Sequence, residues 1–360
     1  MPATSDCPDT PVASGEILIT KLTLHEIHSL GGVIHQKRVT LPLPFEVMNE
    51  VAIEDVSGFL TDETLDWVSK HLGIYQTETL KSVRFALVHR YTLDSSIMGT
   101  DDEAESEKLI KNLIELIHII RPMRQDTSIV RGQQSGDNFR VVGLETPTRL
   151  EVPEVQKSFH LRNQDLHLLK QTAPLFIQAM QSAAMKFRTA VAYHNVGRLV
   201  THGNARFLLW CSALEALYTS HTYNHQGSLV ATERIKWFLG PQTQVYEEGD
   251  VPDFILNQPH LTVADIVTKI YEVRNFIAHG DVLPRKYFET TLREGVAGDV
   301  ATIEVLGEAL SFIVRKSLLR ILRDDLFYHF KTAATTDAFF GAQGLTRSLL
   351  KKGIAEALNG

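Results

Sequence analysis

The residues of this chain best suited to chemistry lie in one hexapeptide, which begins at Arg274, ends at His279 and is followed by Gly280. Arginine presents a planar fork of donors that matches a phosphate, and histidine can carry a proton near neutral pH. Asn275, directly after the arginine, can orient the imidazole or a phosphate through hydrogen bonds. We therefore take Arg274, His279 and Asn275 as candidate catalytic residues for chemistry at a phosphodiester.

The spacing within this hexapeptide restricts how its side chains can meet. Residues five apart on an ideal helix lie about 140° apart around the axis, so Arg274 and His279 do not share a helix face. They converge only if the last turn loosens before Gly280 or if two copies of the chain meet. Glu272, seven residues before His279, lies on the same side of a helix and is a candidate supporting hydrogen-bond partner of the imidazole.

Purely structural roles are the alternative for these residues. A histidine in a last helical turn interacts favourably with the helix terminus by about 0.3–1 kcal/mol, and an arginine beside an apolar stripe can extend its guanidinium group to solvent.

Glu215 lies in a strongly apolar segment, where a carboxylate needs a partner. We expect it to support the bundle by pairing with an arginine, of which Arg234 is one candidate, or with a helix end.

The elements that must position the hexapeptide are helical. Thr262 and Asp265 form a capping arrangement ahead of the apolar stripe of Ile266, Ile270, Val273 and Ile277, and Gly280 suits the residue after a helix end. Helical spacing also marks residues 176–191 and 207–218, and further helices are expected over 227–239 and 302–330. The simplest arrangement of these elements is an all-α antiparallel helical bundle.

The first half of the chain contains both strand-like and helix-like sequence patterns, which indicates an α+β domain. Short strands are expected at 17–19 and 83–88, and Leu41–Pro44 is typical of an edge segment. Helices are expected at 61–72 and 101–120, where capping or acidic residues precede an apolar stripe. The predicted organisation is a disordered lead (1–15), an α+β domain of unknown role (16–125), a glycine- and proline-containing linker (126–160), the helical bundle (161–332) and a C-terminal tail with a short helix (333–360).

Composition excludes several classes of protein. No apolar run reaches the roughly 18–20 residues that span a bilayer, and the polar start is unlike a secretory signal, so we expect a cytoplasmic protein without a membrane partner. Two cysteines, Cys7 and Cys211, are too few for a disulfide framework or a cysteine-based zinc site. The net charge is −7, but residues 1–159 carry −9 and residues 160–360 carry +2, which permits a polyanion at the helical half.

Metals and cofactors are not expected. His221 and His225 have a spacing that can place two metal ligands on one helix face, but no cluster of cysteines or carboxylates completes a site. The sequence contains no phosphate-binding loop of the Walker type and no dinucleotide fingerprint.

Two segments resemble a known family. Residues 206–218 end in Leu214-Glu215-Ala216-Leu217, and residues 270–280 contain Arg274, a polar residue and then His279 at a capped helix end. Together they resemble the HEPN domain, specifically its Apea-like subgroup, over roughly the second half of the chain. The resemblance implies a helical bundle that dimerises. In many members it also implies metal-independent cleavage of RNA at a cleft formed by two copies of the motif, often in prokaryotic defence or toxin systems.

These observations give one leading hypothesis and two alternatives. The leading hypothesis is a homodimeric endoribonuclease in which Arg274 and His279 act on RNA and the N-terminal domain recognises a substrate, a regulatory protein or a ligand. The second is a non-catalytic dimeric interaction or RNA-binding module whose N-terminal domain senses a ligand. The third, a nucleotide-modifying enzyme, would use the same phosphate-binding pair.

Overall fold

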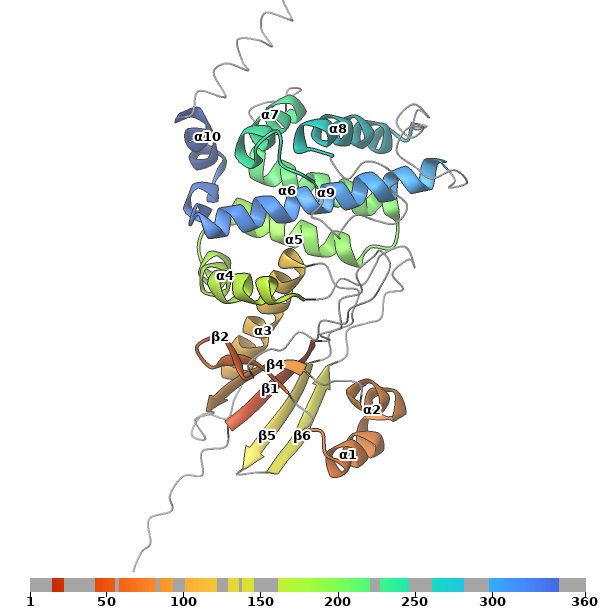
Figure 1. Cartoon of the computed structure of the whole chain (residues 1–360), viewed down its shortest axis with the longest axis vertical. Coiled ribbons are helices and arrows are strands. Elements are labelled where there is room, and N and C mark those ends of the chain that lie inside the picture. The colour runs from red at the N-terminus through yellow and green to blue at the C-terminus, as the bar shows by residue number, and fades with distance from the viewer. Residues whose placement is uncertain are drawn as a thin grey trace, which may run out of the picture. The chain divides into compact units, whose positions relative to one another are not determined.

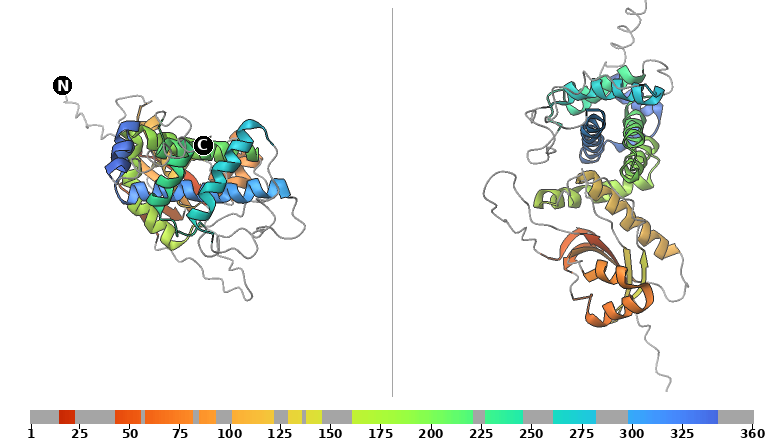
Figure 2. Two further views of the ribbon diagram at one scale, coloured as in Figure 1. Left: turned by 90° about the horizontal axis from the view of Figure 1, so that it is seen from above. Right: turned by 90° about the vertical axis from the view of Figure 1, so that its right-hand side faces the viewer.

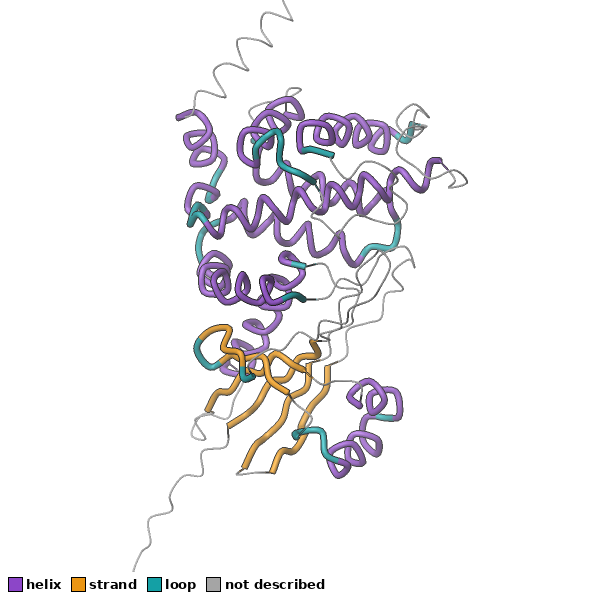
Figure 3. Tube along the Cα trace, viewed as in Figure 1, coloured by secondary structure: helices purple, strands orange, loops and turns teal. Residues whose placement is uncertain are grey.

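The structure is a computed structural model that describes residues 15–22, 43–55, 58–81, 85–92, 101–121, 129–135, 138–145, 161–220, 227–245, 261–281 and 298–342. The chain divides into two compact units. The first unit contains the N-terminal sheet, and the second contains the helices from residue 161 onward together with the segment Glu115–Arg124. Figures 1 and 3 show the sheet and the helices of each unit. The predicted disordered lead lies outside the described residues, except for Gly15.

The first unit is built on an antiparallel sheet. Its described strands are β1 (Gly15–Leu22), β2 (Phe45–Met48), β3 (Val51–Asp55), β4 (Phe85–Thr92), β5 (Ile129–Ser135) and β6 (Asn138–Glu145). They follow the order β2-β3-β4-β1-β5-β6, so β1 lies between β4 and β5. Ile53, Leu87 and Val88 are fully buried on β3 and β4. The predicted α+β class of this half is confirmed.

The predicted linker at 126–160 is wrong for much of its length. Its residues form the β5–β6 hairpin, and β5 pairs with β1, where Ile17 lies opposite Gly132. This hairpin belongs to the first unit, which includes residues 125–148. The polar sequence of β5 does not mark it as a strand, and one of its two partners, β1, is more than a hundred residues away along the chain.

The helices before residue 125 are α1 (Asp62–Leu72) and α2 (Ile74–Lys81), which belong to the first unit, and α3 (Asp101–Ile120), whose residues from Glu115 onward belong to the second unit. The predicted cap of α1 is confirmed, since the Thr61 hydroxyl accepts a hydrogen bond from Thr64 N at 3.3 Å. The predicted bounds of α3 are also confirmed. Its buried stripe includes Leu113 and Leu116, both fully buried.

The second unit is helical in its described part, apart from an isolated bridge between Gln244 and Thr262. Its helices are α4 (Asn163–Gln181), α5 (Met185–Leu199), α6 (Gly203–Tyr218), α7 (Gly227–Leu239), α8 (Val263–His279), α9 (Gly298–Arg323), the 3₁₀ helix η3 (Phe327–Phe330) and α10 (Ala333–Ala342). Helix α6 packs against α5, α7, α8 and α9. Figures 1 and 2 show α4 and α8 on opposite sides of the layer that contains α6 and α9. None of the described helices is both long and apolar enough to cross a bilayer.

Two predicted helices differ from the structure. Residues 176–191, expected as one run, are split between α4 and α5 by a short turn at Ser182, whose backbone N–H bonds to Gln178 O at 2.9 Å. The last long helix ends at Arg323 rather than at Phe330, because the chain turns at Asp325 with φ 50° and continues as η3. The short helix expected in the tail is α10.

Trp210 fixes α6 against its neighbours. Its ring is buried, and its Nε1 donates to His194 O on α5 at 3.1 Å. A Cβ added at Gly197 would lie 2.5 Å from Trp210 Nε1, and a Cβ added at Gly307 of α9 would lie 3.7 Å from Trp210 Cζ3. The two glycines thus allow the indole to lie between α5 and α9, and this holds the helix that carries Glu215.

Several titratable groups are buried where the end of α3 meets α5. Burial lowers the pKa values of His118 and His194 well below 6.5. Arg198 Nη1 lies 2.8 Å from His118 Nδ1, and because a guanidinium can only donate, that imidazole nitrogen accepts and His118 is neutral. Burial also raises the pKa of Glu115 to about 7, although Asn195 and Arg198 oppose this shift.

Candidate functional site

Helix α8 begins and ends at the predicted residues. Thr262 and Asp265 form the capping box: the Thr262 hydroxyl accepts from Asp265 N at 3.3 Å and the Asp265 carboxylate accepts from Thr262 N at 2.9 Å. Gly280 adopts the left-handed conformation with φ 73°. Its N–H bonds to Ile277 O and the N–H of Asp281 bonds to Phe276 O, which is the Schellman arrangement. The candidate residues therefore lie on a helix that is fixed at both ends.

Arg274 pairs with Glu215 across two helices. Arg274 Nη2 on α8 lies 3.3 Å from Glu215 Oε1 on α6, and the side chains are 34% and 31% exposed. Arg274 Nη1 also donates to Asn275 Oδ1 at 3.4 Å. The structure thus brings together three of the predicted site residues. The suggested pairing of Glu215 with Arg234 is wrong, because Arg234 is fully buried and lies 2.9 Å from Asp337 instead.

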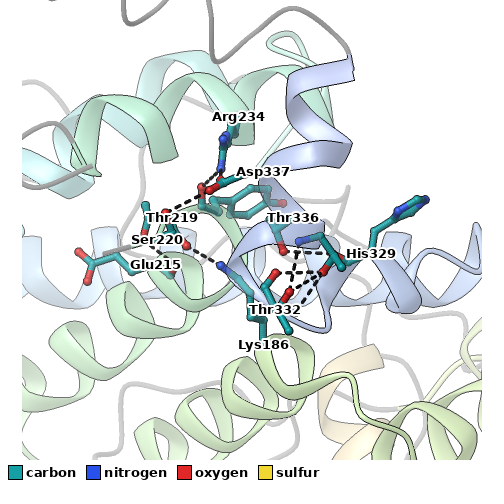
Figure 4. A network of polar contacts seen from close by, with 11 residues as sticks. Lys186, Glu215, Thr219, Ser220, Arg234, His329, Thr332, Thr336 and Asp337 are labelled. Carbon is teal, nitrogen blue, oxygen red and sulfur yellow. Dashed lines mark hydrogen bonds and ion pairs between the residues drawn. The ribbon is translucent and has the colours of Figure 1, made fainter. Parts of the chain in front are cut away.

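A polar network secures the end of the helix that presents Glu215. Arg234 Nη1 donates to Tyr218 O at 2.8 Å, Lys186 Nζ donates to Thr219 O, and the Thr219 hydroxyl donates to Glu215 O at 2.8 Å. These contacts satisfy carbonyls that a helix end leaves without partners. Figure 4 shows this network, with the Glu215 carboxylate pointing away from it. The carboxylate thus remains available to Arg274 while its backbone is held in place.

Two buried side chains lie close to the ion pair. Cys211 and Tyr271 are 1% and 3% exposed, and the charges of both Glu215 and Arg274 act on their pKa values. Within the described residues the Tyr271 hydroxyl has no hydrogen-bond partner. Burial raises the pKa of Glu215, and the nearby Arg274 charge partly offsets this effect. The sequence analysis did not select Tyr271, although its place three residues before Arg274 puts both on neighbouring turns of α8.

His279 is not brought to Arg274 within one chain. Helix α8 continues without interruption to His279, so the two side chains stay about 140° apart around its axis. His279 and Asn275 are both exposed. The helix therefore presents its arginine and its histidine to solvent on different sides.

The expected contact between Glu272 and His279 is absent from the described residues. Glu272 is exposed on α8, and seven residues of helix separate the two positions by about 10.5 Å along the axis. They share a side of the helix but lie two turns apart. The sequence spacing predicted that Glu272 and His279 lie on the same side of the helix, but the distance between them along the axis is too long for a contact.

The histidine pair weighed as a metal site, His221 and His225, lies outside the described residues. Among the residues that the structure does describe, no group of three or more His, Cys, Asp or Glu side chains could hold a metal ion.

The arrangement can bind an anion more readily than it can catalyse a reaction in one chain. Arginine has five N–H donors, and Glu215 and Asn275 each engage one of the terminal nitrogens of Arg274. The remaining donors can reach a phosphate oxygen on the exposed side.

Comparisons of this chain with protein-family models, with curated proteins and with solved structures gave no match.

Proposed function

We propose that the protein is a homodimeric, metal-independent endoribonuclease of the HEPN type in which Arg274 and His279 act on RNA. The observation that carries this proposal is the position of Arg274, which is oriented by Glu215 and still one-third exposed at the capped end of α8. A guanidinium held in this way can bind the non-bridging oxygens of a phosphate with two N–H donors. The exposed His279 at the end of the same helix supplies a proton carrier.

The helix geometry supports a dimer as the active form. One regular helix holds Arg274 and His279 on different sides, so a second copy must bring its own α8 to complete the site. A two-fold axis near the ends of the two helices would place two arginines and two histidines around one cleft. Each histidine then needs to perform only one proton transfer at a time.

The reaction needs a base, an acid and positive charge, but no metal. One His279 removes the proton of a ribose 2′-hydroxyl, whose oxygen forms a bond to the adjacent phosphorus. The bond from phosphorus to the 5′-oxygen breaks, and the partner's His279 donates a proton to that oxygen. Arg274 stabilises the charge on the crowded phosphorus centre. The products are a 2′,3′-cyclic phosphate and a 5′-hydroxyl.

One observation favours a second candidate function, a non-catalytic RNA-binding or interaction module. Glu215 neutralises the guanidinium charge that catalysis requires, since the two side chains lie 3.3 Å apart. In this alternative the helical unit dimerises and binds, while the N-terminal sheet domain senses a ligand or a regulatory protein.

Cleavage of labelled single-stranded RNA in EDTA distinguishes the two functions. The endoribonuclease predicts cuts with cyclic phosphate ends that are lost in both Arg274→Ala and His279→Ala. A matched control is His167→Ala, which removes an exposed histidine from α4 and should cleave like the parent protein. Intact RNA with the parent protein, accompanied by binding that Arg274→Ala weakens, indicates the binding module.

A further inference from the structure

The helical unit contains a polar cavity that the proposed RNA site does not use. Its volume is about 350 Å³, and its lining comes from the end of α3, the first turn of α4 and one side of α9. Four cationic side chains line it: Arg121, Arg315, Lys316 and Arg323. Asp165 contributes the one carboxylate among the lining residues that the structure describes, so the formal charge of these described residues is +3.

Asp165 is already engaged by other groups. Its Oδ2 accepts from Arg121 Nε at 3.1 Å and from Arg162 N at 2.8 Å, and its Oδ1 accepts from Arg121 Nη2 at 3.1 Å. Arg121 and Asp165 are 3% and 5% exposed, so the pair is a fixed part of the wall. The charges of this pair are opposite, and the other cationic side chains among the described lining residues come from α9.

Contacts within the unit position two of the three α9 cations of the lining, Arg315 and Lys316. Arg315 Nη1 donates to the carbonyls of Ile119 and Ile120 at 3.4 and 3.2 Å, which ties α9 to the end of α3. The Arg315 guanidinium and the Lys316 ammonium also lie 5.4 and 5.0 Å from the centre of the Phe312 ring. A cavity with positioned cations binds an anion at a lower cost in side-chain ordering than a mobile surface patch does.

We propose that this cavity binds a small molecule that carries two or more phosphate groups. Its volume falls within the range of small-molecule sites, about 300–1,000 Å³. A charge of +3 favours a multivalent anion over a monovalent carboxylate. Arg315, Lys316 and Arg323 supply the donors that phosphate oxygens accept, and the lining amide of Gln164 adds neutral donors.

This site is separate from the proposed RNA site. It uses α3, α4 and α9, whereas Arg274 lies on α8, and α4 and α8 lie on opposite sides of the α6–α9 layer (Figures 1 and 2). An occupant would bridge three helices of the unit and stabilise it through mass action. The proposal does not depend on whether the protein cleaves RNA.

Calorimetric titration of the full chain with inorganic triphosphate tests the proposal. We expect saturable binding that Lys316→Glu and Arg323→Glu each weaken at least about tenfold. The matched control is Lys331→Glu, which makes the same charge change at an exposed residue after η3 and should bind like the parent. Circular dichroism and thermal unfolding verify that each variant is folded.

Three results would overturn the proposal. The first is no binding of triphosphate by the folded parent up to about 1 mM. The second is binding that the two α9 variants do not alter, and the third is binding lost in Arg274→Ala but kept in the α9 variants. Pyrophosphate and a nucleoside triphosphate, titrated in parallel, distinguish an inorganic from an organic ligand. Competition by a single-stranded oligonucleotide for the same α9 residues would assign the cavity to RNA instead.

Discussion

Arg274 and Glu215 form an ion pair between α8 and α6, with Nη2 and Oε1 3.3 Å apart and about one-third of each side chain exposed. The pair both orients and neutralises the guanidinium. We expect these two opposing effects to determine how strongly Arg274 binds a phosphate. Substitution of Glu215 tests them directly.

Glu215→Gln should strengthen RNA binding. The amide keeps the size of the side chain but removes the negative charge beside Arg274, so we expect the Kd for single-stranded RNA to fall about three- to tenfold. The free energy of unfolding should change by no more than about 1 kcal/mol, because the pair is partly exposed. Fluorescence anisotropy with labelled RNA measures the effect. Glu233→Gln, which breaks a pair with Lys236 on α7, is the control; unchanged or weaker binding by Glu215→Gln contradicts the account.

Tyr271→Phe should not destabilise the protein. The Tyr271 hydroxyl is buried without a hydrogen-bond partner among the described residues, so its removal should raise the free energy of unfolding by up to about 1 kcal/mol. The matched variant is Tyr218→Phe, since the equally buried Tyr218 hydroxyl donates to Ser317 Oγ at 2.8 Å and its loss should cost about 1 kcal/mol. Urea unfolding compares the two. A loss of stability in Tyr271→Phe would show that this hydroxyl is bonded in solution.

Gly197→Ala should destabilise the helical unit by about 1–3 kcal/mol. The added methyl group would lie 2.5 Å from Trp210 Nε1 and would force the indole away from His194 O. Gly227→Ala in α7 is the control, because a Cβ there meets nothing within 4 Å, and it should be neutral or stabilising. Thermal unfolding of both variants distinguishes steric contact from helix propensity. Equal melting temperatures would indicate that α5 and α6 pack differently.

Glu115→Gln should change how stability depends on pH. Burial raises the pKa of Glu115 in the folded state to about 7, against an ordinary value of 4.5, so the folded state holds a proton that the unfolded state releases between these values. The parent therefore loses stability from this group as pH rises from 4.5 to 7, and the variant does not. We expect the variant to gain about 1–3 kcal/mol relative to the parent across this interval.

Urea unfolding of parent and variant at several pH values checks this expectation. His118 and His194 act in the opposite sense, because their lowered pKa values make folding more favourable as pH rises toward 6.5, but they are present in both proteins. A difference between Glu115→Gln and the parent that stays constant from acid to neutral pH would show that Glu115 has an ordinary pKa.

Local signals in the sequence predicted local structure well. The capping box at Thr262 and the left-handed Gly280 lie where their residue types require, because both depend on contacts within a few residues. The strand β5 was missed because one of its two hydrogen-bonding partners, β1, is distant in sequence. The break between α4 and α5 at Ser182 has no glycine or proline to mark it, whereas Pro174 lies inside α4 without ending it.

The sequence did not predict how the candidate residues pair with one another. The sequence indicated that Glu215 needs a partner, but the choice between Arg234 and Arg274 depends on how α6, α7 and α8 pack. Arg234 instead bonds to Asp337 of α10, a helix whose packing against α7 no local pattern reveals. The cavity beside α9 was not predicted at all, because its cations come from segments separated by nearly two hundred residues.

The most direct test of the central claim is RNA cleavage by a mixed dimer. Parent and His279→Ala chains, co-expressed with different tags and purified together, give a dimer that retains both arginines but only one histidine at the shared cleft. The account predicts that the parent dimer cleaves labelled RNA in EDTA to cyclic phosphate ends and that the mixed dimer is as inactive as the His279→Ala dimer, because one of the two proton transfers has no carrier. A mixed dimer with about half of the parent's activity, or a monomeric parent that cleaves, would contradict it.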